Sequence, residues 1–274
     1  MERKAIEAIE TIEAIEAIEA IATIKAIKAI TTMKTILTIA GSDCSGGAGI
    51  QQDLRTITYL RQYAATAITA LTCQNTLGVK SVNPVSTDIV SQQIDAIVTD
   101  LNIDAVKIGM IPNLACAKVI AKTVSTLSCP IVYDPVMVST SGTRLMDEDC
   151  IEYLASHLFP LCSLVTPNIP EHSILSPYLQ STPYLRKGGH AETEDMTDIL
   201  YMPDGSIHSY SAPKIESSNL HGTGCCLSSA IATYLALGLD LPQAVGKAKE
   251  TVTHAIELAS HHNIGHGNGP ILPL

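Results

Sequence analysis

Several features are missing from this sequence of 274 residues, and each absence excludes a class of function. No cluster of lysine or arginine occurs and the formal net charge is −10, so a nucleic-acid partner is not expected, because binding to phosphates requires a basic surface. No apolar run is long enough to span a bilayer, so a membrane is not expected as a partner either. An acidic protein can still bind ATP, which requires only local N–H groups, one or two basic side chains and Mg²⁺.

The eight cysteines form no C-x-x-C pair, so neither a zinc nor a redox motif is indicated. Most of them lie in apolar runs, where a free cysteine behaves as a small hydrophobic residue. No signal peptide is recognisable, and we therefore expect a reduced, cytoplasmic setting. A group of histidines near the C-terminus could hold a metal or decorate a helix end, and the lack of a carboxylate or cysteine beside them favours the helix end. These histidines are His254, His261, His262 and His266.

Residues 1–32 differ in composition from the rest of the chain. Isoleucine recurs at every third residue from Ile6 to Ile30, so the apolar stripe spirals around a helix and leaves it no single apolar face. We interpret this segment as a low-complexity extension, with Met33 as a plausible true start, and an oligomerisation helix as the alternative. Residues 33–274 are expected to form one domain.

From Lys34 onward, buried strands alternate with amphipathic helices. We predict strands over residues 35–40, 64–72, 105–108, 130–133 and 163–165, and a hairpin of 198–202 with 207–211. We predict helices over residues 49–61, 87–101, 113–126, 148–158, 225–237 and 242–261. The alternation predicts an α/β fold with a mostly parallel, doubly wound sheet, in which functional loops lie at the carboxyl ends of the strands.

The segment His221–Cys225 reads HGTGC and leads directly into a predicted helix. Its two glycines allow several unpaired backbone N–H groups to point at one place, at the positive end of the helix dipole. Such a turn suits a phosphate whose charge grows during transfer. The cysteine lies in the same field, which we expect to lower its pKa and favour the thiolate.

Polar residues also surround the first two strands. The loop Gly41–Gly49 is neither a G-x-G-x-x-G nor a Walker A sequence, and it fits a ligand-binding turn or an ordinary strand-to-helix turn equally well. Asp53 and Gln74 could together read the donors and acceptors of a polar heterocycle. For a lone glutamine, an ordinary loop hydrogen bond is the simpler interpretation.

Carboxylates stand at the ends of two later strands. Asp134 ends one of them, and Thr166-Pro167-Asn168 followed by Glu171 ends the next. These carboxylates could hold Mg²⁺ directly or through water. Asn168 and Glu171 also match an N-cap and N3 pair, and both interpretations can hold together. Lys187, beside two glycines, could reach a nucleotide phosphate or belong to a surface turn.

Together these motifs resemble the bacterial hydroxymethylpyrimidine/phosphomethylpyrimidine kinases of thiamine biosynthesis, in the ribokinase-like superfamily. The resemblance extends from about Met33 to Pro270. It rests on TIAGSDCSGGAGIQQDL (38–54), ITALTCQNTLG (68–78), KIGM (107–110), DPVMVSTS (134–141), TPNIPE (166–171), KGGH (187–190), HGTGC (221–225) and GHGNGP (265–270).

The resemblance implies a ribokinase-like three-layer α/β sandwich, with helices on both faces of the sheet, as a kinase domain over residues 33–274. It implies two successive ATP-dependent steps, in which 4-amino-5-hydroxymethyl-2-methylpyrimidine and then its monophosphate are phosphorylated. ATP and Mg²⁺ are the implied cofactors, a small pyrimidine is the implied substrate, and relatives suggest a homodimer.

The resemblance also implies a role for each motif residue. Cys225 would act as base or proton acceptor for the attacking hydroxyl. The anion hole for the γ-phosphoryl group would consist of Gly222, Thr223 and Gly224. The pyrimidine pocket would consist of Gln74, Gly41, Asp53 and Met110. ATP would bind at Lys187, Asp134, Thr166 and Asn168, and Mg²⁺ at Glu171 and Asp134.

The segment between Glu171 and Lys187 departs from the family pattern, because it is about half of the usual length. Its two prolines disfavour a long helix, and the strand before Lys187 is expected to be short, over Tyr184–Arg186. This shortening concerns the nucleotide side of the site more than the pyrimidine side.

Two other functions therefore stay open. One is a pyridoxine or pyridoxal kinase, since related enzymes accept that ring and its hydroxymethyl group; Gln74 and Met110 favour the aminopyrimidine. The other is a pyrimidine-binding pseudokinase that has lost productive ATP binding. The intact HGTGC segment and Lys187 argue against it, because a pure binding protein does not require an anion hole.

Overall fold

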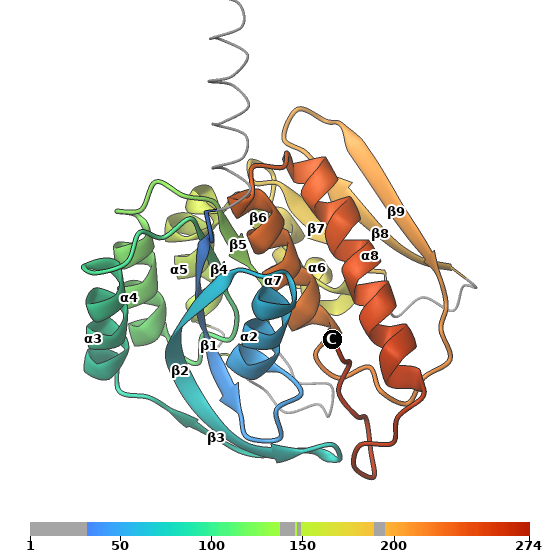
Figure 1. Ribbon diagram of the computed structural model, residues 1–274. Helices are drawn as coiled ribbons and strands as arrows, with labels where there is room; N and C mark the ends of the chain where they lie inside the picture. Colours follow the sequence, from blue (N-terminus) through green and yellow to red (C-terminus); the bar gives the residue numbers. More distant parts are fainter. Residues whose placement is uncertain (1–31, 138–145, 147–148, 189–194) are drawn as a thin grey trace, which may run out of the picture. The chain divides into compact units, whose positions relative to one another are not determined.

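The computed structural model describes residues 32–137, 146, 149–188 and 195–274. Within this part, Lys34–Leu274 form one compact unit (Figure 1). The expectations for residues 1–31, and for the ends of two motifs at 138–141 and 189–190, lie outside the described residues and stay predictions.

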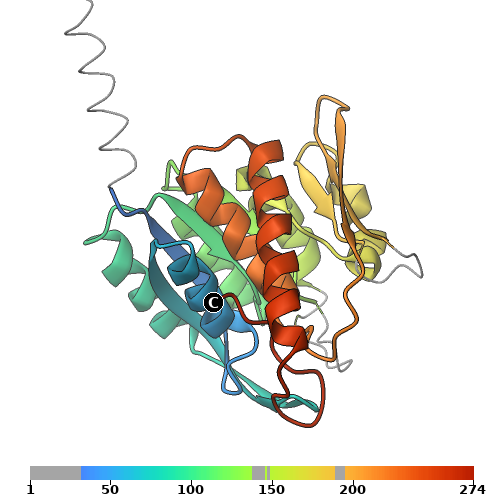
Figure 2. The same ribbon diagram turned by 45° about the vertical axis from the view of Figure 1, so that its right-hand side comes forward.

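A sheet of nine strands, counted over the described residues, forms the centre of the unit (Figure 2). Its order is β3-β2-β1-β4-β5-β6-β7-β8-β9. The consecutive strands β2, β1, β4, β5, β6 and β7 pair in parallel, whereas β3 at one edge and β8 and β9 at the other pair in antiparallel fashion. The strands are β1 (Thr35–Asp43), β2 (Tyr63–Asn75), β3 (Gly78–Pro84), β4 (Ala105–Ile108), β5 (Ile131–Tyr133), β6 (Leu164–Val165), β7 (Tyr184–Arg186), β8 (Asp195–Tyr201) and β9 (Ile207–Pro213).

Helices cover both faces of this sheet, which confirms the predicted three-layer α/β architecture (Figure 1). Helices α3, α4 and α5 lie on one face, and α2, α7 and α8 lie on the other. The helices are α2 (Gly49–Tyr59), α3 (Thr87–Val98), α4 (Leu114–Val124), α5 (Cys150–His157), α6 (Ile169–Leu175), α7 (Thr223–Ala236) and α8 (Leu241–Ser260).

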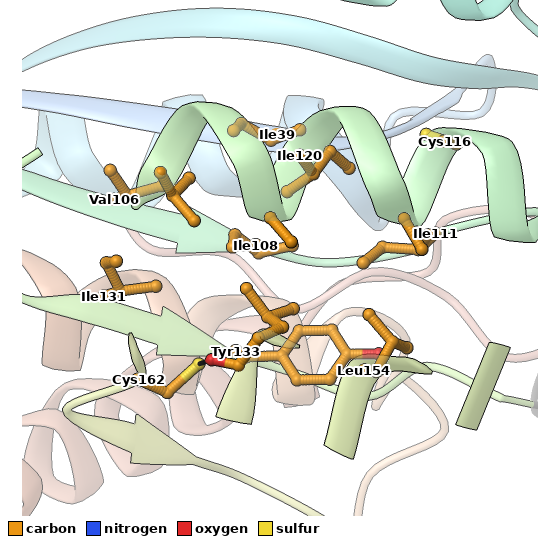
Figure 3. Packing of buried hydrophobic residues seen from close by; sticks show 14 of the residues in the cluster. Ile39, Val106, Ile108, Ile111, Cys116, Ile120, Ile131, Tyr133, Leu154 and Cys162 are labelled. Carbon is orange, nitrogen blue, oxygen red and sulfur yellow. Dashed lines mark hydrogen bonds between the residues drawn. The ribbon is translucent and has the colours of Figure 1, made fainter. Parts of the chain in front are cut away.

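The short central strands are apolar because both of their faces are buried. Along β5, Ile131 and Tyr133 pack against the α3–α5 layer, while Val132 packs against the α2–α7–α8 layer. Figure 3 shows the Tyr133 ring lying beside Leu154 and Cys162. Packing on both faces holds the strand firmly, and Asp134 follows directly at its carboxyl end.

Two local elements lie beside the central strands, at residues 169–186 and 78–84. The shortened segment before Lys187 forms the seven-residue helix α6 and the three-residue strand β7, as the prolines predicted. Strand β3 was not predicted, because the sequence analysis assigned no element between residues 73 and 86. It forms because β2 offers a free edge, and β3 pairs with it from Asn75↔Gly78 to Ala70↔Pro84.

Candidate active site

A cavity of about 690 Å³ opens at the carboxyl ends of the parallel strands. Gly41 from β1, Gln74 from β2 and Met110 after β4 contribute to its lining. Asp134 after β5, Lys187 after β7 and the first turn of α7 contribute as well. Motifs that are far apart in the sequence therefore meet at one place, as the doubly wound topology predicts.

The Gly-Thr-Gly turn begins helix α7 at this cavity. Gly222 is the N-cap and has a φ of 87°, a left-handed conformation that favours glycine. No side chain of the described residues caps the helix, which leaves first-turn N–H groups available to a ligand. A Cβ atom on Gly222 would overlap the carbonyl oxygen of Gly47. The turn and the loop Gly41–Gly49 are thus packed backbone against backbone.

A side-chain hydrogen bond also joins the same turn and loop. The Nε2 atom of His221 lies 2.9 Å from Oδ2 of Asp43 and 3.3 Å from the Nε2 atom of Gln74. The backbone N–H groups of Gly47 and Ala48 donate to the same carboxylate oxygen. Burial opposes ionisation of Asp43, but hydrogen bonds from His221 and from Ser45 hold its pKa well below its usual range. Sequence analysis assigned no role to Asp43 or His221, although each lies inside a recognised motif.

An ion pair between Lys187 and Asp134 lines the same cavity as Cys225. Lys187 Nζ lies 2.7 Å from Oδ1 of Asp134, and the hydroxyl of Thr166 donates to the same oxygen at 3.1 Å. Burial opposes ionisation of Asp134, but the charges of Lys187 and Lys107, together with the hydrogen bonds from Lys187 and Thr166, outweigh burial and lower the pKa of Asp134. A Cβ atom on Gly224 would lie 3.4 Å from Oδ2 of Asp134 and 3.5 Å from Lys187 Nζ. The anion turn and this ion pair therefore adjoin each other.

Helix α6 begins beside this ion pair with a capping box. The Asn168 side chain accepts the N–H of Glu171 at 2.8 Å, and the Glu171 side chain accepts the N–H of Asn168 at 2.8 Å. This confirms the predicted N-cap and N3 pair. Burial raises the pKa of Glu171. Both residues line the cavity, so the cap leaves them available to a ligand.

Two of the expected binding residues lie outside the cavity lining. Asp53 is fully buried below it, where Lys107 Nζ lies 2.8 Å from Oδ1, and it does not line the pyrimidine pocket as expected. It faces inward because its side of α2 packs onto the sheet and onto α7, as Ile57 does one turn later. Thr166 is also fully buried and reaches the cavity only through its hydrogen bond to Asp134.

The expectation that the helix terminus lowers the pKa of Cys225 is wrong for this structure. Burial raises the pKa of the thiol to about 11. The charge of Lys107 opposes this increase, whereas the carboxylates of Asp53 and Asp134 add to it. Those charges belong to distant strands and helices, so the local motif could not reveal them. Cys225 does line the cavity beside Gly224.

The carboxylates suit a magnesium ion that is held largely by other oxygen ligands. No group of three or more His, Cys, Asp or Glu residues that could hold a metal occurs in the described part of the chain. Mg²⁺ usually keeps several waters and takes one or two carboxylates together with phosphate oxygens. Asp134 and Glu171 both line the cavity and meet that requirement. The premise that no carboxylate lies beside the C-terminal histidines is wrong for His254, which lies on α8 with its Nδ1 atom 3.7 Å from Oε2 of Glu257.

None of the helices over residues 32–137, 149–188 and 195–274 combines the length and the apolar character that a membrane crossing would need.

Comparison with known proteins agrees with this arrangement. Residues 43–272 match the family model described as "Phosphomethylpyrimidine kinase". The chain is 42% identical to a hydroxymethylpyrimidine/phosphomethylpyrimidine kinase of Rhizobium meliloti, over 85% of this chain and 94% of that protein. It is also 42% identical to the thiamine biosynthesis bifunctional protein ThiED of Geobacter sulfurreducens, again over 85% of this chain but spanning only 51% of that protein.

Solved structures show the same fold. The crystal structure of a phosphomethylpyrimidine kinase from Clostridium difficile superposes with a TM-score of 0.70 at 37% identity, covering 81% of this chain and 99% of that one. A pyridoxal kinase from Staphylococcus aureus, in complex with AMP-PCP and pyridoxal, superposes with a TM-score of 0.78 at 27% identity. That match covers 88% of this chain and 93% of the other.

Proposed function

The chain belongs to the phosphomethylpyrimidine kinase family, and we propose that it phosphorylates a hydroxymethylpyrimidine in two successive steps. ATP donates its γ-phosphoryl group first to the hydroxymethyl oxygen of 4-amino-5-hydroxymethyl-2-methylpyrimidine and then to the monophosphate. One observation carries the proposal: the Gly222 turn, Cys225 and the Asp134–Lys187 pair adjoin one another in a cavity that Gln74 also lines.

The pyrimidine fits the part of the cavity lined by Gly41, Gln74 and Met110. A Cβ atom on Gly41 would lie 3.1 Å from Sδ of Met110, so a side chain there would narrow the space for a flat ring. The carboxamide of Gln74 offers one acceptor and two donors, which can pair with the amino group and ring nitrogens of an aminopyrimidine. The carboxamide also lies beside the imidazole of His221, with the two Nε2 atoms 3.3 Å apart.

The γ-phosphoryl group would be transferred from ATP, bound at Lys187, to the pyrimidine in this pocket. First-turn N–H groups of α7 would stabilise the growing negative charge, and removal of one such donor commonly costs about 10²–10³ in rate. Cys225 would accept the proton of the attacking hydroxyl. Mg²⁺, when bound with the nucleotide, neutralises phosphate charge, and Asp134 and Glu171 would hold it through their oxygens.

The nucleotide base would occupy the far end of the cavity. Side chains of α8 (Val252 and Ile256) and of the segment after β9 (Ile215) make that end apolar, which suits a purine ring. The complex of the related Staphylococcus aureus kinase with AMP-PCP supports the use of ATP. Lys187 lines the cavity although β7 is only three residues long, which argues against a pseudokinase.

The test is ADP release from Mg-ATP by the purified protein with hydroxymethylpyrimidine, its monophosphate or pyridoxal at equal concentrations. We expect turnover with both pyrimidines. Turnover with pyridoxal alone would move the assignment to a pyridoxal kinase, the activity named for the Staphylococcus aureus neighbour. Pyrimidine binding without any turnover would favour the pseudokinase.

The proposal includes the homodimer and the cytoplasmic setting expected from the sequence. Light scattering of the purified full chain tests the first, and fractionation of cells that produce the chain tests the second.

A further inference from the structure

Three side chains that meet in the cavity wall include two with no role in the mechanism above. Asp43 ends β1, Gln74 lies near the end of β2 and His221 lies just before α7, and all three line the cavity. Nε2 of His221 lies 2.9 Å from Oδ2 of Asp43 and 3.3 Å from Nε2 of Gln74. One ring nitrogen therefore contacts both a carboxylate and the carboxamide that we expect to read the ligand.

The carboxylate of Asp43 accepts hydrogen bonds on both of its oxygens. The N–H and the hydroxyl of Ser45 donate to Oδ1 at 2.8 and 2.7 Å. The N–H groups of Gly47 and Ala48 donate to Oδ2 at 3.0 and 2.8 Å. Four donors on two oxygens fit an ionised carboxyl, which can only accept. The proton in its contact with His221 must therefore belong to Nε2 of the imidazole.

The imidazole of His221 is fixed from several sides. A Cβ atom on Gly47 would overlap Cδ2 of the ring, so the ring lies directly against that glycine. The backbone N–H of His221 donates to the carbonyl of Gly269, and its carbonyl accepts the N–H of Ile271. The Nε2 proton is thus held at one place in the cavity wall.

This proton selects the orientation of the Gln74 carboxamide. An amide fills nearly the same volume in either orientation, so its hydrogen-bond partners decide between the two. With the NH2 group toward His221, two donors face each other; a half-turn of the carboxamide places its oxygen there, where it accepts from Nε2. The backbone of Gln74 is held separately, because its N–H and carbonyl bond Sγ of Cys44 at 3.4 and 3.2 Å.

We propose that Asp43 and His221 are positioning residues for Gln74: they hold the oxygen of its carboxamide, so that its NH2 group faces the ligand. The site then offers a donor, and it selects a heterocycle whose ring nitrogen accepts a hydrogen bond. The ring nitrogens of a pyrimidine meet this requirement. The inference rests on the proposed function for the identity of the ring.

Gln74→Glu is the decisive variant, because the two orientations predict opposite results. A carboxylate still accepts from His221, but it presents its second oxygen to the ring nitrogen, where two acceptors repel each other. If the carboxamide oxygen faced the ligand instead, Gln74→Glu would keep that acceptor and the pyrimidine would bind as before. Asn75→Asp is the matched control, since it makes the same change of charge at an exposed neighbour outside the cavity lining.

The measurement is the dissociation constant of 4-amino-5-hydroxymethyl-2-methylpyrimidine, by isothermal titration calorimetry with the full-length protein and no nucleotide. We expect the constant to rise at least tenfold in Gln74→Glu, because the polar groups of ring and site are left unpaired. It should change less than twofold in Asn75→Asp. Unchanged or tighter binding by Gln74→Glu, or an equal loss in Asn75→Asp, would overturn the inference.

The role of His221 is tested through the same constant. His221→Leu removes the donor and should weaken binding at least tenfold, whereas His221→Gln restores an N–H at the ε position and should bind within threefold of the unsubstituted protein. In a Gln74→Ala background, His221→Leu should change the constant less than twofold, because a positioning residue acts only through its partner. A tenfold loss in that background, or no rescue by His221→Gln, would overturn the inference.

Binding requires no phosphoryl transfer, so these measurements separate the inference from the proposed function. A pyrimidine that binds with the expected pattern but releases no ADP from Mg-ATP would refute the proposed function alone. Turnover of the pyrimidine by the unsubstituted protein, together with unchanged binding by Gln74→Glu, would refute the inference alone.

Discussion

Substitution of Gly222 by alanine tests the anion turn most directly. Two costs follow from the structure. Alanine at a φ of 87° costs roughly 1–2 kcal/mol, because Cβ crowds the following carbonyl in the left-handed region. The new Cβ would also overlap the carbonyl oxygen of Gly47 and lie 3.1 Å from Cγ of Gln52. Ordinary contact requires about 3.5 Å, and the Cβ atom would lie 2.0 Å from that oxygen, so turn and loop must separate by roughly 1.5 Å.

Gly238, at the other end of the same helix, supplies a matched control. Its φ is 91°, and a Cβ atom there would meet nothing within 4 Å. Gly238→Ala therefore carries the conformational cost alone, about 1–2 kcal/mol. Gly222→Ala carries that cost plus about 1–3 kcal/mol for overpacking. In a domain of this size about 1 kcal/mol lowers the melting temperature by roughly 2–4 °C.

The effect on turnover should exceed the effect on stability. Displacement of catalytic groups by about 1 Å commonly costs about 10²-fold in rate, so Gly222→Ala should lower kcat at least that far with both pyrimidine acceptors. The kcat of Gly238→Ala should equal that of the unsubstituted protein. The assay is ADP release at saturating Mg-ATP, with melting followed by circular dichroism. Equal kcat values for the two variants would refute the assignment of this turn as the anion hole.

Three further substitutions test other parts of the site. Cys225→Ala should reduce the rate of phosphorylation of the hydroxymethyl group about 10²-fold or more, with little loss of pyrimidine binding. The rate with the monophosphate should fall much less, because a phosphate monoester is already largely ionised near neutral pH. Equal losses of rate with both acceptors would contradict the role of Cys225 as proton acceptor. The folded pKa of Asp43 is lowered, so its stabilising effect is present above its unfolded pKa of about 3.9 and is lost as the pH falls toward the folded value. Urea unfolding at pH 7 and pH 3 gives the difference in free energy of unfolding between the unchanged protein and Asp43→Asn. This difference should be smaller at pH 3, whereas an equal difference at both pH values would contradict the pairing of Asp43 with His221. The side chain of Asn219 donates to the carbonyls of Ala259 and His262 at 2.7 and 2.6 Å, and Ala259 also accepts the N–H of His262. Asn219→Ala should therefore lower the free energy of unfolding by about 1–3 kcal/mol, mainly through the carbonyl of His262, as measured in the same titration. An unchanged value would show that water replaces the side chain.

Features that depend on neighbours in the chain could be predicted from the sequence. The Asn168–Glu171 cap is local, because its partners are three residues apart and their spacing is set by the helix itself. The end of β5 at Tyr133 follows likewise from a short apolar run before proline, and the start of α7, predicted at Cys225 and observed at Thr223, follows from the glycines before it. The parallel sheet follows from their alternation, and it brought Gln74, Asp134 and Lys187 to one edge.

Strand β3 and the His221–Asp43 pair could not be predicted in this way. β3 is a strand only because the edge of β2 pairs with it. The His221–Asp43 pair joins residues 178 positions apart, and each half alone is an ordinary loop residue.

The sequence alone therefore determined the α/β class, the order of the elements and the family to which the motifs belong, since periodicity, turn chemistry and motif order are properties of the chain. The tertiary structure decided the direction in which a given side chain points and the charges that surround it. Asp53 turned inward to Lys107 rather than toward the pocket, because one face of α2 had to be buried. The pKa of Cys225 rose to about 11 rather than falling, because burial and distant carboxylates act through space and outweigh the local helix terminus.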